Sequence, residues 1–218
     1  IKLDGTRFEP QAHLALLANY ERARDWQNAA QIARRLESTG QGSFKGRLSH
    51  YLCEQAAACV STGDLAHAFE HLNQAMHMAP DAPRPRMDLA RLQGLHGKPE
   101  AAYETLTQAL AIAPTATPLI APLLAESAIA SAQGTHALAR LKAIYAETPS
   151  LDVLDAMVEL EAASGAPTAT AREWYARHLE REPSLVAAAK WIAGEKLEHE
   201  QFHPQVQRAL DQAVKPLT

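Results

Sequence analysis

The sequence predicts an all-α solenoid built from helix-turn-helix pairs stacked along the chain. Two observations favour this fold class. Alanine, which has the highest helix propensity, supplies 44 of the 218 residues. In addition, residues 63–80 recur in similar form as residues 97–114. No alternating pattern of apolar and polar residues predicts a competing β-strand.

The recurrence has a period of 34 residues and a fixed packing pattern. In its second helix, Ala68, Leu72 and Ala75 run small, large and small, so that neighbouring helices approach closely and Leu fills the space between them. Pro80 ends the unit because proline cannot continue a helix. Seven identical pairs share the spacing: Gly63/Gly97, Ala68/Ala102, Leu72/Leu106, Gln74/Gln108, Ala75/Ala109, Ala79/Ala113 and Pro80/Pro114. This period predicts a tetratricopeptide-repeat solenoid, a right-handed superhelix with a concave groove.

Extending the register outward predicts a single array over residues 1–218. Five extra residues near the first junction predict an unusually long helix from about Phe44 to Ser61. In the fifth repeat, strict spacing places Asp155 and Glu159 in packing positions, so the register of its first helix stays open. A last helix pair is expected at about 185–197 and 204–214. The predicted repeats span approximately 9–40, 44–80, 83–114, 117–149, 150–183 and 184–214.

Composition limits the class of partner. The formal net charge is −4 and the isoelectric point about 6.2, which argues against nucleic acid. No apolar run approaches the roughly 20 residues that span a bilayer, so no membrane span is predicted. The two cysteines suit a reducing compartment. Since the sequence starts at Ile1 without a signal segment, we expect it to be a piece of a longer protein.

Two groups of side chains could carry chemistry, and neither is favoured. His67 and His71 are four residues apart, the spacing of two zinc ligands on a helix, but no third ligand follows at a suitable distance. His50, Cys53 and Glu54 could place a thiolate beside an imidazole and a carboxylate. A helix surface rarely excludes water well enough for such a site. We therefore predict a protein that is not an enzyme and holds no cofactor or metal.

The groove of the predicted solenoid is the candidate binding site for a protein partner. The first helix of each repeat usually lines the groove, and His50 and Cys53 stand at its lining positions. The other candidate residues stand at equivalent positions one repeat earlier and one repeat later. Arginine beside methionine and aromatic residues is typical of peptide-recognition surfaces. Ordinary solvated or packing roles remain the alternative. The candidate groove residues are Arg22, His50, Cys53, Arg84, Met87 and Arg91, with Leu14 on the first helix.

The aromatic residues of the repeats are expected to pack between helices and not to stack on bases. They recur at helical spacing, and the acidic net charge agrees with this interpretation. The residues concerned are Tyr20, Trp26, Tyr51, Tyr103, Tyr145, Trp174 and Trp191.

Two segments resemble the lipopolysaccharide assembly protein B (LapB, also called YciM) family. Residues 49–56, SHYLCEQA, are similar to that family's AHFYCELA helix, and residues 25–36, DWQNAAQIARRL, are similar to its EWQKAIDVAERL helix. The resemblance extends over about residues 8–114. Residue by residue, it carries over to Trp26, His50, Tyr51, Cys53 and Glu54.

This resemblance implies a repeat core from a larger protein at the cytoplasmic face of the bacterial inner membrane. Such proteins have an N-terminal membrane anchor and a C-terminal rubredoxin-like module that binds iron through two CxxC pairs; neither occurs in these residues. Their partners are the membrane AAA+ protease FtsH and proteins of lipopolysaccharide synthesis, including the deacetylase LpxC. The resemblance thus implies an adaptor that regulates lipopolysaccharide biosynthesis by linking FtsH to control of LpxC.

Two other functions stay open from the sequence. The array could be the protein-interaction half of a larger enzyme such as a glycosyltransferase, whose intact length would reveal an additional catalytic domain. It could also be a co-chaperone that grips a C-terminal carboxylate. That mode uses a cluster of Lys and Asn in the groove, and no such cluster stands at the expected positions, so it ranks last.

Overall fold

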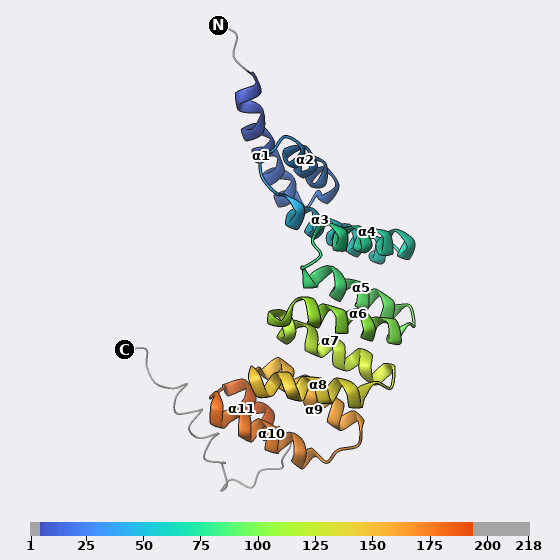
Figure 1. Ribbon diagram of the computed structural model, residues 1–218, viewed down its shortest axis with the longest axis vertical. Helices are drawn as coiled ribbons and strands as arrows, with labels where there is room; N and C mark the ends of the chain where they lie inside the picture. Colours follow the sequence, from blue (N-terminus) through green and yellow to red (C-terminus); the bar gives the residue numbers. More distant parts are fainter. Residues whose placement is uncertain (1–4, 194–218) are drawn as a thin grey trace, which may run out of the picture. The chain divides into compact units, whose positions relative to one another are not determined.

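The computed structural model describes residues 5–193, and these form α-helices joined by short turns (Figure 1). Helix accounts for 82% of the described residues, and no strand occurs among them. The all-α prediction is confirmed. The helices are α1 (Gly5–Ala23), α2 (Trp26–Ser38), α3 (Lys45–Ser61), α4 (Leu65–Met78), α5 (Pro83–Leu95), α6 (Pro99–Ile112), α7 (Thr117–Ala130), α8 (Gly134–Glu147), α9 (Leu151–Ala163), α10 (Thr168–Arg181) and α11 (Leu185–Ile192), with a 3₁₀ turn at Pro114–Ala116.

The helices divide into two compact units, residues 1–114 and 115–218. In the first unit α1 packs on α2, α3 on α4, and α5 on α6. Successive pairs are joined by contacts of α2 with α3, and of α5 with both α3 and α4. As predicted from the extra junction residues, α3 is long, with 17 residues. In the second unit α7 contacts α8 and α9, and α10 contacts α9 and α11. The predicted helix at 204–214 lies outside the described residues.

Each turn inside a helix pair is closed by the same backbone geometry. Its central residue is left-handed, and the N–H of the next residue donates to the carbonyl five residues earlier, as in Asp64 N to Cys59 O at 2.8 Å. Glycine tolerates this conformation without steric cost, which explains Gly63 in the turn between α3 and α4. The left-handed residues are Arg24, Gly63, Gly97, Ala132 and Gly165.

Helix packing follows the pattern that the sequence predicts. Ala68 and Ala75 are fully buried in α4, and Leu72 between them is 1% exposed. The residues at equivalent positions of α6 and α8 are buried as well; they are Ala102, Leu106, Ala109, Ala137 and Leu141. Small residues allow close helix approach and leucine fills the remaining volume.

The fifth repeat is one residue out of the strict register. The left-handed turn residues Ala132 and Gly165 are 33 residues apart, whereas Gly63 and Gly97 are 34 apart. The turn after α9 is one residue longer than the turn after α7, which restores the spacing by the start of α10. As a result Leu154 is buried, Asp155 one residue later is only half-buried, and Glu159 is exposed. Strict spacing therefore pointed one residue too far along α9.

Candidate protein-interaction surface

Arg84 on α5 connects the polar side chains of two neighbouring first helices. Its Nη2 donates to Glu54 Oε1 of α3 at 2.6 Å, and its Nη1 donates to His50 Nδ1 of the same helix. Within α5, Arg84 Nε contacts Asp88 Oδ2 at 3.4 Å, and Arg91 Nη1 donates to Asp88 Oδ1 at 2.8 Å. We call these five residues, His50, Glu54, Arg84, Asp88 and Arg91, the Arg84 cluster.

The two arginines of the cluster remain accessible. The side chains of Arg84 and Arg91 are 46% and 50% exposed, while Glu54 and Asp88 are 28% and 24% exposed. The two carboxylate side chains are thus less exposed than the two arginine side chains. Guanidinium groups present five donors in a rigid planar arrangement, which suits partner carboxylates.

An aromatic group adjoins the cluster at His50. The ring of Trp26 from α2 meets His50 edge to face at 5.4 Å and stacks on Tyr51 at 5.9 Å. Tyr51 is buried, and its hydroxyl donates to Glu21 of α1. The pKa of Tyr51 is raised by burial and by Glu21, so the hydroxyl stays protonated and keeps this hydrogen bond. Three of the residues carried over by the resemblance therefore lie together in the structure.

Two predicted groove residues are buried instead of lining a surface. Cys53 is 2% exposed and Met87 is 9% exposed, because both belong to the packed side of their helices. Cys53 lies among apolar residues of α3, α4 and α5. Of the remaining candidates, His50, Arg84 and Arg91 are exposed in the Arg84 cluster, and Arg22 is exposed in the last turn of α1. Leu14 is exposed on the same helix.

Burial also decides the state of the Cys53 thiol. Desolvation, together with the charges of Asp88 and Glu54, raises the pKa of Cys53 to about 12, and Arg84 opposes this only in part. The thiol is therefore protonated at neutral pH and is a poor nucleophile. His50, Cys53 and Glu54 do not form an activated thiolate group.

The histidine pair of α4 is not arranged as a metal site. His67 Nδ1 contacts Asp64 Oδ2 at 2.6 Å at the start of the helix, where Asp64 also accepts from the backbone N–H of His67. Within residues 5–193 no group of three or more His, Cys, Asp or Glu side chains is placed to hold a metal ion. No single helix within these residues is long and apolar enough to cross a membrane. Taken together, the helical segments 99–112 and 114–130 reach the length and mean hydropathy of a membrane span.

Sequence reasoning missed one member of the Arg84 cluster and one cavity. Asp88 stands four residues after Arg84 and three before Arg91, a helical spacing that predicts their ion pairs. In the second unit, Tyr145 and Trp174 were assigned to packing, but they also line a cavity with basic residues. The four-residue spacing of Arg177 and Arg181, about one helical turn, was the sequence signal that could have indicated this cavity.

Comparison with known proteins supports the repeat assignment. The tetratricopeptide-repeat family model matches residues 60–126. A search of the curated proteins gave no match. Tetratricopeptide repeats imply a scaffold for protein–protein interaction.

Several solved structures are similar to this chain, and one of them has a TM-score above 0.5. The MamA protein superposes with a TM-score of 0.52 at 13% identity, over 85% of this chain and 96% of that chain. A putative kinesin light chain repeat protein of Podosopora anserina has a TM-score of 0.49 at 19% identity, over 88% and 98%. Pseudomonas aeruginosa PilF has a TM-score of 0.49 at 15% identity, over 96% and 100%. At 13% identity, the MamA likeness concerns the tetratricopeptide-repeat fold alone.

Proposed function

We propose that this chain is a non-catalytic adaptor that holds a protein partner against the Arg84 cluster. One observation carries the proposal: Arg84 of α5 joins His50 and Glu54, two residues of the segment that resembles the LapB family. Nothing in helix packing requires this connection, since its members are partly exposed. A partner on this face would contact two successive repeats at once.

The chemistry of the cluster suits exchange with a partner. Arg84 and Arg91 are about half exposed, so an incoming carboxylate can reach their guanidinium groups and compete there with Glu54 and Asp88. Arginine and tryptophan are the residue types that most often dominate binding energy at interfaces. Here a chain of contacts connects Trp26, Arg84 and Arg91. Trp26 meets His50, His50 accepts from Arg84, and both arginines contact Asp88.

The identity of the partners is proposed from the family resemblance. The partners would be a membrane AAA+ protease of the FtsH type and proteins of lipopolysaccharide synthesis such as LpxC, so that the adaptor links proteolysis to control of that pathway. The complete protein would act at the cytoplasmic face of the bacterial inner membrane. Any iron would be bound by a rubredoxin-like module outside these 218 residues. The protonated, buried Cys53 supports a role without catalysis.

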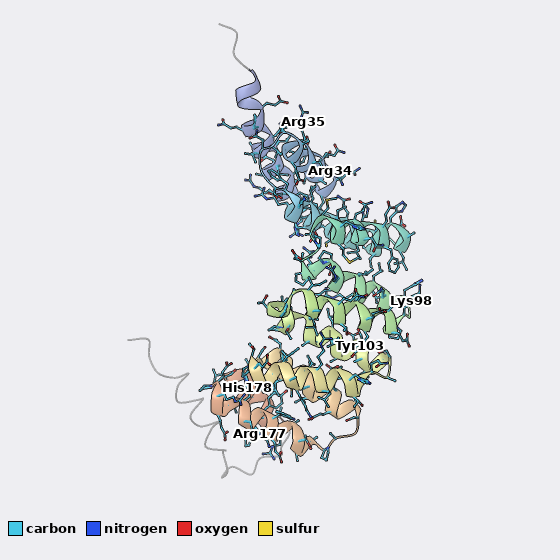
Figure 2. The ribbon with its side chains drawn as sticks, in the orientation of Figure 1. Arg34, Arg35, Lys98, Tyr103, Arg177 and His178 are labelled. Carbon is cyan, nitrogen blue, oxygen red and sulfur yellow. The ribbon has the colours of Figure 1, made fainter. Side chains whose placement is uncertain are left out.

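Binding of purified protease and deacetylase to the complete chain tests the proposal. The test variant is Arg84→Glu with Arg91→Glu, and the matched control is Arg34→Glu with Lys98→Glu. The control makes the same change in net charge at two exposed positions of the first unit outside the cluster (Figure 2). Circular dichroism melts show whether both variants are folded.

We expect the cluster variant to weaken binding by about tenfold or more, the loss of a typical interface hot spot. The control should bind like the wild type. Equal binding by both variants would place the partner elsewhere. If neither purified protein binds the wild type, the lipopolysaccharide proposal fails, whereas a different protein that binds through the cluster would preserve the adaptor role.

A further inference from the structure

A second candidate site lies in the other unit, on different helices. A cavity of about 400 Å³ is lined by Lys142 and Tyr145 of α8 and by Trp174, Arg177 and Arg181 of α10. These are second helices of their pairs, whereas the Arg84 cluster lies on the first helices α3 and α5. We propose that this cavity binds an acidic peptide segment of a protein partner, with a carboxylate at Arg177 and Arg181 and an apolar side chain against Trp174.

The aromatic floor of the cavity is fixed by buried contacts. Tyr145 and Trp174 meet edge to face, with ring centroids 6.0 Å apart and an interplanar angle of 88°. The Tyr145 hydroxyl and His178 Nδ1 are 2.8 Å apart, and His178 is 1% exposed. Burial lowers the pKa of His178, so the imidazole is neutral at pH 7 and can share this hydrogen bond. A floor that is already ordered loses little entropy on binding a ligand.

The basic residues at the cavity differ in how firmly they are paired. Lys142 Nζ lies 2.7 Å from Glu161 Oε1 and 5.4 Å from the Trp174 ring centroid, so its charge is largely neutralised. Arg177 is 65% exposed, and its ion pair with Glu173 of the same helix spans 3.8 Å. Within residues 9–193 Arg181 makes no ion pair. Arg177 and Arg181 are therefore the donors available to a ligand.

The spacing of these two arginines favours an anion. They are four residues apart on α10, where like charges destabilise a helix by about 0.2–0.5 kcal/mol. A bound carboxylate would relieve this repulsion and accept two charge-assisted hydrogen bonds from one guanidinium. Glu180 also lines the cavity, Glu173 pairs with Arg177, and the charge of Glu182 acts on Tyr145, so these carboxylates offset part of the positive charge.

The Trp174 ring supplies the apolar half of the site. Lys142 and Arg177 both lie within cation–π distance of it, at 5.4 and 5.6 Å, and hold the indole in place together with Tyr145. Trp174 Nε1 donates to Glu161 Oε2 at 3.1 Å, which fixes the ring orientation further. Tryptophan and arginine together are the most frequent hot-spot residues of interfaces. The volume suits one or two side chains.

Fluorescence anisotropy with labelled peptides tests the proposal on the complete chain. The probes are the heptapeptide with three Glu on each side of a central Phe, the same peptide with Lys for Glu, and a single-stranded thymidine heptanucleotide. The test variant is Arg177→Glu with Arg181→Glu. The matched control is again Arg34→Glu with Lys98→Glu, which changes net charge equally (Figure 2).

We expect saturable binding of the acidic peptide, weakened about tenfold or more by the test variant and little changed in the control. Replacing the central Phe by Ser should weaken it again in the wild type. Equal loss in both variants, no saturable binding, or tighter binding of the oligonucleotide would overturn the proposal. Arg84→Glu with Arg91→Glu should leave this peptide bound, so failure here is distinguishable from failure of the adaptor role.

Discussion

The arginines of the two units differ in the partners that the fold gives them. In the first unit Arg84 bridges His50, Glu54 and Asp88, so its donors are used within the protein. In the second unit Arg177 has one loose ion pair on its own helix and lies beside the Trp174 ring. The same residue type therefore presents an exchangeable ion pair in one unit and available donors in the other.

Exposure alone therefore does not identify an arginine that binds a partner. At the Arg84 cluster a partner has to replace internal carboxylates, so specificity depends on how well it reproduces their geometry. At the α8–α10 cavity an anion can contact the arginines without breaking a strong ion pair within the protein.

The largest effect is expected when equivalent core leucines are truncated. Leu72→Ala in the first unit and Leu141→Ala in the second should each lower the free energy of unfolding by about 2–5 kcal/mol, since both side chains are fully or almost fully buried. Urea denaturation measures the change. Leu95→Ala, at a position 78% exposed, is the control and should stay within about 0.5 kcal/mol. A small loss at only one leucine would show that the two units pack differently.

Overpacking of the small position should cost less. Ala68→Leu inserts a large side chain where α4 meets its neighbours and should destabilise the protein by about 1–3 kcal/mol. Ala66→Leu on the exposed side of the same helix is the matched control. If both substitutions are neutral in thermal melts, the small–large–small register of the repeat is wrong.

Two histidines, one in each unit, should respond to acid in opposite directions. Burial depresses the pKa of His178 in the folded protein, so the unfolded chain takes up a proton first as pH falls below about 6.5. The stability associated with neutral His178 is therefore present above that pH and is lost below it. Asp64 raises the pKa of the exposed His67, whose contribution is present below pH 6.5 and lost as pH rises through the raised value.

Unfolding free energies at pH 7.5 and 5.5 separate these effects. Compared with the wild type, His178→Gln should lose less stability on acidification, and His67→Gln should lose more. The exposed His136→Gln serves as the control in the second unit. A wild-type pH dependence in the His178 variant would contradict the assigned role of this histidine.

The smallest effect concerns the turns. Ala132 has the left-handed conformation, φ 57°, that Gly63 has at the equivalent position of the first unit, φ 79°. Ala132→Gly should therefore stabilise the protein by about 0.5–1 kcal/mol, and Gly63→Ala should destabilise it by a similar amount. Thermal melts of both variants give the signs. Stabilisation by Gly63→Ala would show that this turn is not left-handed in solution.

Much of the fold was predictable because it depends on local patterns. The 34-residue period, the buried Ala68, Leu72 and Ala75, and the long α3 follow from residue spacing alone. The fifth repeat was not predictable in register, since the one-residue change is absorbed in a turn between α9 and α10. Spacing cannot show which turn takes up an inserted residue.

The candidate site was predictable only in part. Helical periodicity identifies which residues share a face, and it placed His50, Arg84 and Arg91 on an exposed one. Burial of Cys53 and Met87 depends on how α3, α4 and α5 approach each other, which periodicity does not fix. The cavity at Trp174 was missed for the same reason, since it forms only where α8 and α10 meet.

Site-specific photo-crosslinking tests the adaptor role of the Arg84 cluster most directly. p-Benzoylphenylalanine is placed at Arg91 in the complete chain, and at Lys98 as a control, and irradiated in the presence of a purified FtsH-type protease and LpxC. We expect a covalent adduct with one of these proteins from position 91 and little or none from position 98. Adducts from both positions in equal yield, or from position 98 alone, would contradict this expectation.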